Sequence, residues 1–235
     1  MVDYHSADRY FRQTKELYGN TCYVQEKKLN IVMEDGSPGP KSLLAFHEQI
    51  SDCLKCALGK KRDKFVFGVG DPNANLLLIG EAPGAKEDEV GEPFVGRAGK
   101  MLDKMLSAID RSREKDVYIC NVLKCRPPDN RDPLPSEVEQ CESYLHMQIQ
   151  LIQPKLIVAL GRVAGKTLLG LDTALKDMRN ITHEYAGTPL RVTYHPAALL
   201  RNSNFKPAAW EDFKWINTFL EKKNKLWYLE KTIKY

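Results

Sequence analysis

An acid, an amide and an imidazole each stand just after a short apolar segment of this chain, and such side chains could act together in electrostatic or acid–base catalysis. They are Glu81, Asn121 and His195. The apolar segments before them have the length and composition of buried strands and are Asn75–Ile79, Val117–Cys120 and Leu190–Tyr194. Because the carboxyl ends of parallel strands meet at one edge of a sheet, we expect the three side chains to converge there.

The stretch Leu76–Gly99 is expected to form the centre of this site. Its apolar start predicts a buried strand, which Gly80-Glu-Ala-Pro-Gly84 ends because glycine and proline disfavour both strand and helix. We expect a rigid loop after it, carrying Glu87, Asp88 and Phe94. A flat aromatic ring beside carboxylates suits a planar polar ligand such as a stacked nucleobase, and a place in the core is the alternative for Phe94.

Four of the six cysteines have the pattern of a metal site. They are a C-x2-C pair followed by two cysteines at wider spacing: Cys53, Cys56, Cys125 and Cys141. Four thiolates suit zinc or an iron–sulfur cluster, and the wide second pair favours a 4Fe–4S cluster because structural zinc usually uses two short-spaced pairs. Four unpaired buried cysteines are the alternative. Cys22 and Cys120 are expected to be packing residues.

Strand-like and helix-like segments alternate through most of the chain. Leu156–Leu160 adds a fourth expected strand. The expected helices are Ser42–Ser51, Gly99–Asp110, Ser136–Ile152 with Ser136 as its N-cap, Arg162–Gly170 and Pro207–Lys223. This alternation predicts an α/β fold, a three-layer α/β/α sandwich around a mainly parallel four-stranded central sheet. We expect an N-terminal extension over 1–40, one domain over 41–220 and a lysine-rich tail over 221–235.

Composition is that of an ordinary globular protein. The 235 residues are 43% hydrophobic and 28% charged, and the net charge of +4 permits a polyanionic partner without requiring one. The sequence contains no run of about 18 apolar residues, and its N-terminus lacks the apolar region of a secretory signal. We therefore expect an intracellular monomer that has no membrane partner.

Four sequence blocks and the cysteines together resemble the family 4 uracil-DNA glycosylases. The blocks are GEAPG at 80–84, PFVGRAG at 93–99, NVLKCRPP at 121–128 and HPAALLRN at 195–202. They follow one another in the family's order between about residues 41 and 220, and the four cysteines resemble the family's 4Fe–4S ligand set. The resemblance implies an enzyme that flips uracil out of single- or double-stranded DNA and hydrolyses its N-glycosidic bond, which leaves an abasic site.

The resemblance also implies three groups of site residues. The catalytic residues would be Glu81, Glu87 and His195. The substrate-binding residues would be Ala82, Phe94 and Asn121. The DNA-binding residues would be Leu199, as a wedge in the base stack, and Arg201, on a phosphate with the basic run Lys60–Lys64.

Each assignment has a chemical reason. The ring of Phe94 would stack on uracil, while the amide of Asn121 can both donate to and accept from the uracil edge. His195 would stabilise the negative charge that develops on uracil O2. Ala82 stands where family 1 enzymes carry an aspartate, so carboxylate assistance to the attacking water would come chiefly from Glu81.

Two alternatives remain open at this point. One is a relative that bonds covalently to the abasic sugar. Such relatives carry a glutamine where this chain has Ala82, and a basic, histidine-bearing insert that residues 178–187 lack apart from His183. The other is a non-catalytic iron–sulfur module that binds DNA or accompanies a polymerase, against which the intact acid, amide and imidazole count.

Overall fold

The computed structural model describes the backbone of residues 42–232 and the side chains of residues 42–223. The chain divides into two units at residue 39, and the described residues belong to the second unit, Pro40–Tyr235. The expected N-terminal extension over 1–40, with Cys22, lies outside the described residues. Helix α9 (Lys206–Thr232) continues into the expected tail without a break at residue 220.

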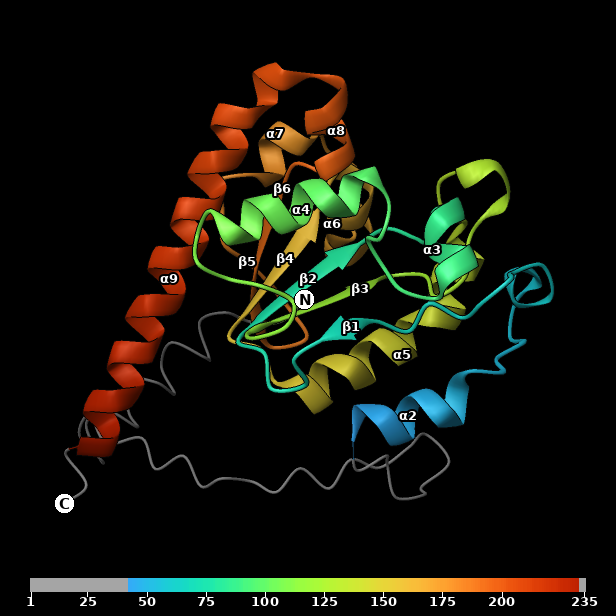
Figure 1. Ribbon diagram of the computed structural model, residues 1–235, viewed down its shortest axis with the longest axis horizontal. Helices are drawn as coiled ribbons and strands as arrows, with labels where there is room; N and C mark the ends of the chain where they lie inside the picture. Colours follow the sequence, from blue (N-terminus) through green and yellow to red (C-terminus); the bar gives the residue numbers. More distant parts are fainter. Residues whose placement is uncertain (1–41, 233–235) are drawn as a thin grey trace, which may run out of the picture. The chain divides into compact units, whose positions relative to one another are not determined.

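A sheet of six strands in the order β1-β3-β2-β4-β6-β5 forms the centre of the second unit (Figure 1). Its four parallel strands are the four predicted from the sequence: β3 (Val117–Asn121), β2 (Leu76–Gly80), β4 (Leu156–Leu160) and β6 (Thr188–Thr193). Every residue of β2, β3 and β4 is buried, which explains their continuous apolar runs.

Two antiparallel edge strands complete the sheet, and neither was part of the expected four-stranded sheet. β1 (Val69–Gly70) pairs with β3, and β5 (His183–Tyr185) pairs with β6. Strands of two and three residues are too short to show an alternating pattern in the sequence, so the expected four-stranded sheet is corrected to six strands.

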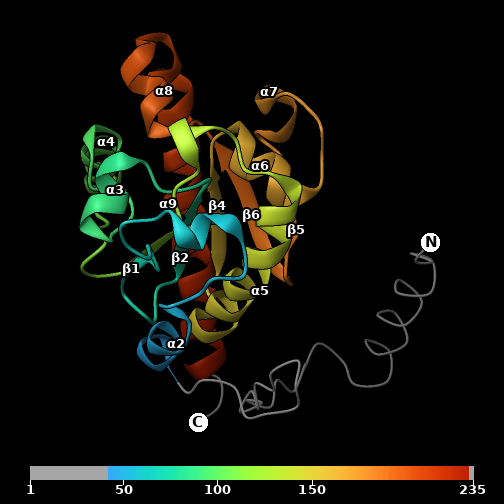
Figure 2. The ribbon, with the colours of Figure 1, turned by 90° about the vertical axis from the view of Figure 1, so that its right-hand side faces the viewer.

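Helices cover both faces of the sheet, as Figures 1 and 2 show, and the predicted three-layer α/β/α arrangement is confirmed. On one face, α4 (Arg97–Ser107) and α9 pack Leu102, Leu106 and Phe213 against the strands. The other face carries α5 (Pro135–Ile152) and α6 (Arg162–Leu169), and α2 (Leu43–Ile50) packs on α5.

Several short helices lie in the connections between the longer elements, at positions where the sequence analysis predicted no helix. They are η1 (Ala57–Lys60), α3 (Ala85–Val90), η2 (Pro128–Asn130), α7 (Leu175–Met178), α8 (Pro196–Arg201) and η3 (Ser203–Phe205). At three to six residues, each is shorter than two helical turns, so no apolar stripe reveals it in the sequence.

The predicted N-cap of α5 is wrong by two residues. The helix begins at Pro135, and Leu134 is the N-cap. The carboxylate of Glu137 accepts the backbone N–H of Leu134 at 2.9 Å and is paired with Arg131 at 2.6 Å. Proline suits the first helical position because its missing N–H would have no partner there, so Ser136 falls inside the first turn.

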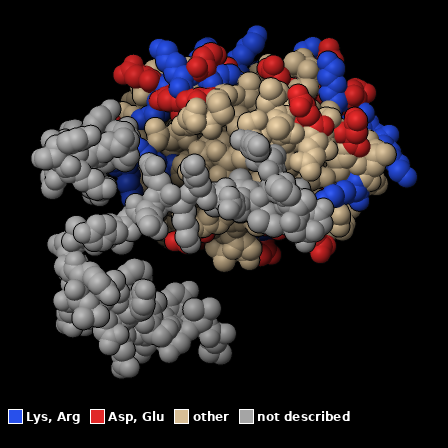
Figure 3. Space-filling model, turned by 90° about the horizontal axis from the view of Figure 1, so that it is seen from below, with Lys and Arg blue, Asp and Glu red and all other residues tan. Residues whose placement is uncertain are grey.

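No described helix is long and apolar enough to cross a membrane. Figure 3 shows the face seen from below, where the visible described Lys and Arg side chains are interspersed with Asp and Glu around the edge. Neither sign of charge gathers there into a continuous patch among those residues.

Candidate active site

The three side chains predicted to converge do follow neighbouring strands of the sheet. Gly80 and Asn121 are paired in the register of β2 and β3, and Glu81 follows Gly80 directly. The ends of β4 and β6 are joined by a hydrogen bond from the N–H of Gly161 to the carbonyl of Thr193 at 2.8 Å. A β-carbon on Gly161 would lie 2.9 Å from the β-carbon of His195, so this glycine lets the histidine pack against the strand end.

The ring of Phe94 lies over the same strand ends. Its centroid is 5.5 Å from that of His195, with the two planes tilted by 34°. A β-carbon on Gly80 would lie 2.8 Å from the Phe94 ring and would overlap the Oδ1 atom of Asn121. The sequence therefore placed the aromatic, the amide and the imidazole correctly around one small region. Phe94 is also 6% exposed and belongs to the hydrophobic core, so the two readings of this residue are compatible.

Asn121 presents an acceptor that no described group satisfies. The side chain is 2% exposed, and its Oδ1 atom has no hydrogen-bond partner among the described residues. A buried polar atom left without a partner costs about 1–3 kcal/mol. Such a cost at a strand end, beside an aromatic ring, is typical of a position that awaits a donor on a ligand.

The neighbours of His195 define both its charge and its tautomer. Burial, and to a lesser degree the charge of Arg201, lower the pKa of His195 to about 4, against an opposing effect of Glu87. The ring is therefore neutral at pH 7. The N–H of Ala197 donates to Nδ1 at 3.1 Å, so the Nε2 atom carries the hydrogen and is the donor. The neutral ring can therefore donate its Nε2 hydrogen to an anion that develops nearby.

Glu81 is half-buried at the end of β2, and its carboxyl group holds a proton unusually tightly. Burial, followed by the negative charge of Asp132, raises the pKa of Glu81 to about 7, while Arg162 acts in the opposite direction. Asp132 follows η2 and Arg162 opens α6, so both flank the strand end. The sequence did not indicate either residue, because neither lies in a block that suggested chemistry.

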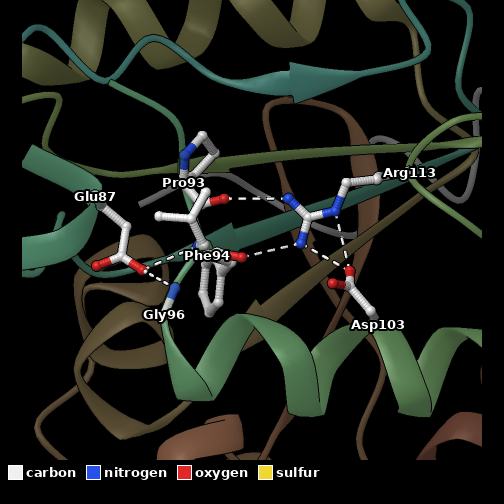
Figure 4. Close-up of polar contacts among 7 residues, drawn as sticks. Glu87, Pro93, Phe94, Gly96, Asp103 and Arg113 are labelled. Atoms are coloured by element: carbon white, nitrogen blue, oxygen red, sulfur yellow. Dashed lines mark hydrogen bonds and ion pairs between the residues drawn. The ribbon is translucent and has the colours of Figure 1, made fainter. Parts of the chain in front are cut away.

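Glu87 lies in the short helix α3 and not in the predicted loop, and its carboxylate accepts hydrogen bonds from backbone amides. In Figure 4 its Oε1 atom accepts the N–H groups of Val95 and Gly96, both at 3.0 Å. These two amides follow Phe94 directly. The geometry gives Glu87 a part in positioning the aromatic loop, and the expected support for the attacking water is not visible in its contacts.

The two adjacent leucines of α8 differ in exposure, contrary to the expected wedge. Leu199 is 3% exposed and faces the interior, whereas Leu200 is 39% exposed. Arg201 is exposed at the end of the same helix, as a phosphate contact requires. In the basic run, Arg62 turns inward, donating to the carbonyls of Cys53 at 2.6 Å and Ser51 at 2.7 Å, while its lysine neighbours are exposed.

The four cysteines with metal-site spacing come from three segments that lie near one another. Two follow α2, one follows β3 and one lies in α5: Cys53, Cys56, Cys125 and Cys141. Burial raises the pKa of Cys125 to about 11, with Arg62 opposing the rise and the thiols of Cys141 and Cys56 adding to it. Burial also raises the pKa of Cys141, and the thiols of Cys56 and Cys53 add to that rise. The four thiols therefore share one electrostatic environment.

Several donors point at these sulfur atoms. The hydroxyl of Tyr144 donates to Cys53 Sγ at 3.2 Å, and Arg62 donates to Cys125 Sγ at 3.5 Å. Donors of this kind stabilise thiolates, and thiolates are what iron requires. In the arrangement described, however, no group of three or more His, Cys, Asp or Glu side chains among residues 42–223 could hold a metal ion.

One buried lysine connects the cysteines with the strand-end site. Lys124 has 0% exposure, and its Nζ donates to the carbonyl of Asn121 at 2.7 Å and to Gln148 at 2.6 Å. Burial lowers the pKa of Lys124, and the nearby thiols, first that of Cys120, oppose this. The sequence placed Lys124 inside a motif but indicated no role for it. The structure makes it a support for the Asn121 backbone.

Comparison with known proteins identifies the class. The family model described as the Uracil DNA glycosylase superfamily matches residues 67–214, which include the site at the strand ends. The chain belongs to this superfamily. The family and the α/β/α fold expected from the sequence are both confirmed.

Pairwise comparisons show which members of the superfamily the chain is similar to. The chain is 45% identical over 191 residues to a type-4 uracil-DNA glycosylase of Archaeoglobus fulgidus, covering 78% of this chain and 96% of the relative. A type-4 uracil-DNA glycosylase of Sulfurisphaera tokodaii is 40% identical over 206 residues, with 79% and 94% covered. A type-5 uracil-DNA glycosylase of Thermus thermophilus is 33% identical, with 64% and 85% covered.

Proposed function

We propose that this protein is a uracil-DNA glycosylase of the type-4 kind, a hydrolase that removes uracil from DNA as the first step of base excision repair. Membership of the superfamily and the similarity to type-4 enzymes support the activity. The observation that carries the proposal is the orphaned Oδ1 atom of Asn121 beside the ring of Phe94.

Uracil is chemically complementary to the Asn121 amide and the Phe94 ring. Its N3–H would donate to the orphaned Oδ1 atom, and its O4 would accept from the amide nitrogen of Asn121. Cytosine presents an acceptor at N3 and a donor at the neighbouring position. Acceptor would then face acceptor and donor would face donor. Because the base is buried in a duplex, it must be flipped out before Phe94 can stack on it.

The reaction breaks the bond between C1′ of the deoxyribose and N1 of uracil. The electron pair of that bond leaves with uracil, so negative charge develops on the ring and its O2 atom. The Nε2–H of neutral His195 donates a hydrogen bond to O2 and stabilises this charge. Water then adds to the electron-deficient C1′, and the proton that it loses neutralises the uracil anion, which leaves an abasic sugar and free uracil.

Glu81 supplies the carboxylate on the sugar side of the site. As an anion it stabilises the positive charge on the departing sugar and orients the water, while Glu87 supports the reaction through the Phe94 loop. Ala82 lines the pocket next to Glu81. This division keeps the expected residues and assigns the two carboxylates different tasks.

The DNA lies across α8, the helix that follows His195. Arg201 contacts a phosphate, and the exposed Lys60, Lys61 and Lys64 extend the basic surface. The wedge that replaces the flipped base is assigned to Leu200 in place of Leu199, because a buried leucine cannot enter a base stack without leaving the core.

The four cysteines would hold a 4Fe–4S cluster. They supply the required four thiolates, with hydroxyl and guanidinium donors on two of the sulfur atoms. A four-iron cluster also spans more space than a single ion, since each thiolate binds a different iron. When bound, the cluster would tie the segment after α2 to β3 and α5, and the hydrolysis itself requires no redox step.

A glycosylase assay on single- and double-stranded oligonucleotides containing one uracil, followed by alkali, tests the activity. We expect strand cleavage at the uracil position and no cleavage of a cytosine control. A shifted protein band on a denaturing gel would instead reveal the covalent relative, and absence of cleavage would favour the non-catalytic module. Light scattering of the purified protein checks the expected monomer.

The cluster has a separate test that does not use activity. Protein purified without oxygen should contain about four irons per chain and absorb broadly near 400 nm. Cys141→Ser should lose this absorbance, whereas Cys120→Ser, which changes a buried cysteine outside the set, should keep it. Retained iron in the Cys141 variant would contradict the ligand assignment.

A further inference from the structure

The loop that carries Phe94 is held in a conformation that it would not adopt by itself. Phe94 has a φ angle of 55°, in the left-handed region that a bulky side chain rarely enters. Such a conformation is energetically unfavourable and persists only where the surroundings enforce it. The contacts around this residue should therefore reveal what enforces it.

One group of contacts comes from an arginine that the sequence did not single out. Arg113 donates from Nη1 to the carbonyl of Pro93 at 3.2 Å and from Nη2 to the carbonyl of Phe94 at 3.1 Å. Figure 4 shows its guanidinium on one side of the loop and the Glu87 carboxylate on the other. The loop is therefore held by a cation on its carbonyls and by an anion on its amides.

The arginine is itself held in place. Asp103, on α4, accepts from its Nε at 3.0 Å and from its Nη2 at 2.7 Å. The Arg113 side chain is 14% exposed. The first turn of α4 approaches closely as well, because any side chain at Gly99 would overlap the Phe94 carbonyl. Asp103, which looks like a solvated helix residue in the sequence, thus acts as an anchor.

We propose that Arg113, oriented by Asp103, is a positioning residue for base recognition. It fixes the strained Phe94 backbone and thereby holds the ring over Gly80 and Asn121, where the flipped uracil would stack. Arg113 does not touch the base. The inference rests on the proposed function, since it takes Phe94 to be the stacking residue.

The guanidinium is chemically specific for this task. It offers donors in a fixed planar fork, so it can serve two successive carbonyls and one carboxylate at once. A lysine at this position would keep the charge but could not reproduce that geometry. Arg113→Lys should therefore show an intermediate loss.

The test compares two uncleavable DNA ligands, one with the uracil base and one without it. One contains 2′-fluoro-2′-deoxyuridine, which resists cleavage of the glycosidic bond, and the other contains a tetrahydrofuran abasic analogue. Arg113→Ala should weaken binding of the first by about tenfold and of the second by less than about twofold. The same substitution in a Phe94→Ala background should have no further effect on either ligand.

Arg111→Ala is the matched control. This neighbouring arginine is equally buried but bonds Asp116 at 2.6 Å and Asn217 at 3.3 Å. The Arg111→Ala substitution should lower thermal stability and leave the preference for the ligand that carries uracil unchanged. If Arg113→Ala proves too unstable to purify, Arg113→Lys and Asp103→Asn carry the same comparison with smaller effects.

Two results would overturn the proposal. Equal weakening of both ligands would make Arg113 a DNA-backbone or purely structural residue, and an undiminished effect in the Phe94→Ala background would show that it acts elsewhere. Failure of the proposed function would look different, because the unmodified protein would then bind the fluorouridine DNA no better than ordinary DNA.

Discussion

Gly80 lies opposite Asn121 in the register of β2 and β3, and a methyl group on this glycine would overlap the Oδ1 atom of the asparagine. The same methyl group would press on the ring of Phe94. The absence of a side chain at one strand position thus keeps the space in which an amide and an aromatic ring can meet a flat base.

Gly80→Ala should therefore abolish most of the activity while leaving the fold intact. We expect kcat/KM for uracil DNA to fall by about 100-fold, because a displacement of about 1 Å in a positioned site is enough for such a loss. A glycosylase assay measures the effect. Gly165→Ala, which crowds Val192 under α6, is the control that should cost stability and spare the activity.

The pH dependence should follow Glu81. With its pKa raised to about 7, kcat/KM should rise as the pH approaches 7 and level off above it, because the anion is the active form. The pKa of about 4 for His195 is too low to produce this change. Asp132→Asn should move the rise to lower pH by removing a like charge, and Arg162→Gln should move it to higher pH.

The control for that profile is Asp129→Asn, which removes a carboxylate of η2 that does not act on Glu81. Its profile should coincide with that of the unmodified protein. Shifts of the two variants in the same direction would contradict the assignment of the rise to Glu81.

Glu81→Gln should lower the activity of the protein and raise its stability. We expect a rate loss of about 100-fold to 1,000-fold. Because the pKa of about 7 in the folded protein exceeds the ordinary glutamate value of 4.5, the folded protein loses stability as the pH rises between these values. The substitution removes this loss. The free energy of unfolding of the variant should therefore exceed that of the unmodified protein by about 1 kcal/mol at pH 8, allowing for solvent screening.

Urea denaturation at pH 4 and pH 8 measures the effect, and the advantage of Glu81→Gln should shrink at the lower pH. An equal difference at both values would show that the ionisation of Glu81 is not its source.

Substitutions of the two adjacent leucines of α8 should have different effects, one on the opening of the DNA duplex and the other on the stability of the fold. Leu200→Ala should reduce activity on double-stranded DNA and leave activity on single-stranded DNA unchanged, because a single strand has no stack to replace. Leu199→Ala should instead lower the free energy of unfolding by about 2–5 kcal/mol as a cavity forms. Equal losses of activity on both DNA forms in the Leu200 variant would contradict the assignment of the wedge to this residue.

Much of the site could be predicted because strands buried on both faces are visible as apolar runs. The ends of those runs place Glu81, Asn121 and His195 on one edge of a parallel sheet, whatever the helices do. The glycine-bounded loop then brings Phe94 to the same edge, since the chain between β2 and α4 is short.

Contacts between distant segments could not be predicted in this way. Arg113 reaches Phe94 across 19 residues of sequence, and no motif marks the pair. The six residues of α8 are too few to show by pattern that Leu199 points inward and Leu200 outward. The raised pKa of Glu81 depends on burial and on two charges from other elements.

The amino-acid sequence by itself determined the parallel strands and the residue types at their ends, because burial and turn formation are local demands on composition. The tertiary structure alone decided how those residues are held, which of them are charged and which face solvent. Those properties depend on distances between segments far apart in the chain, and such distances exist only once the sheet and its helices have packed together.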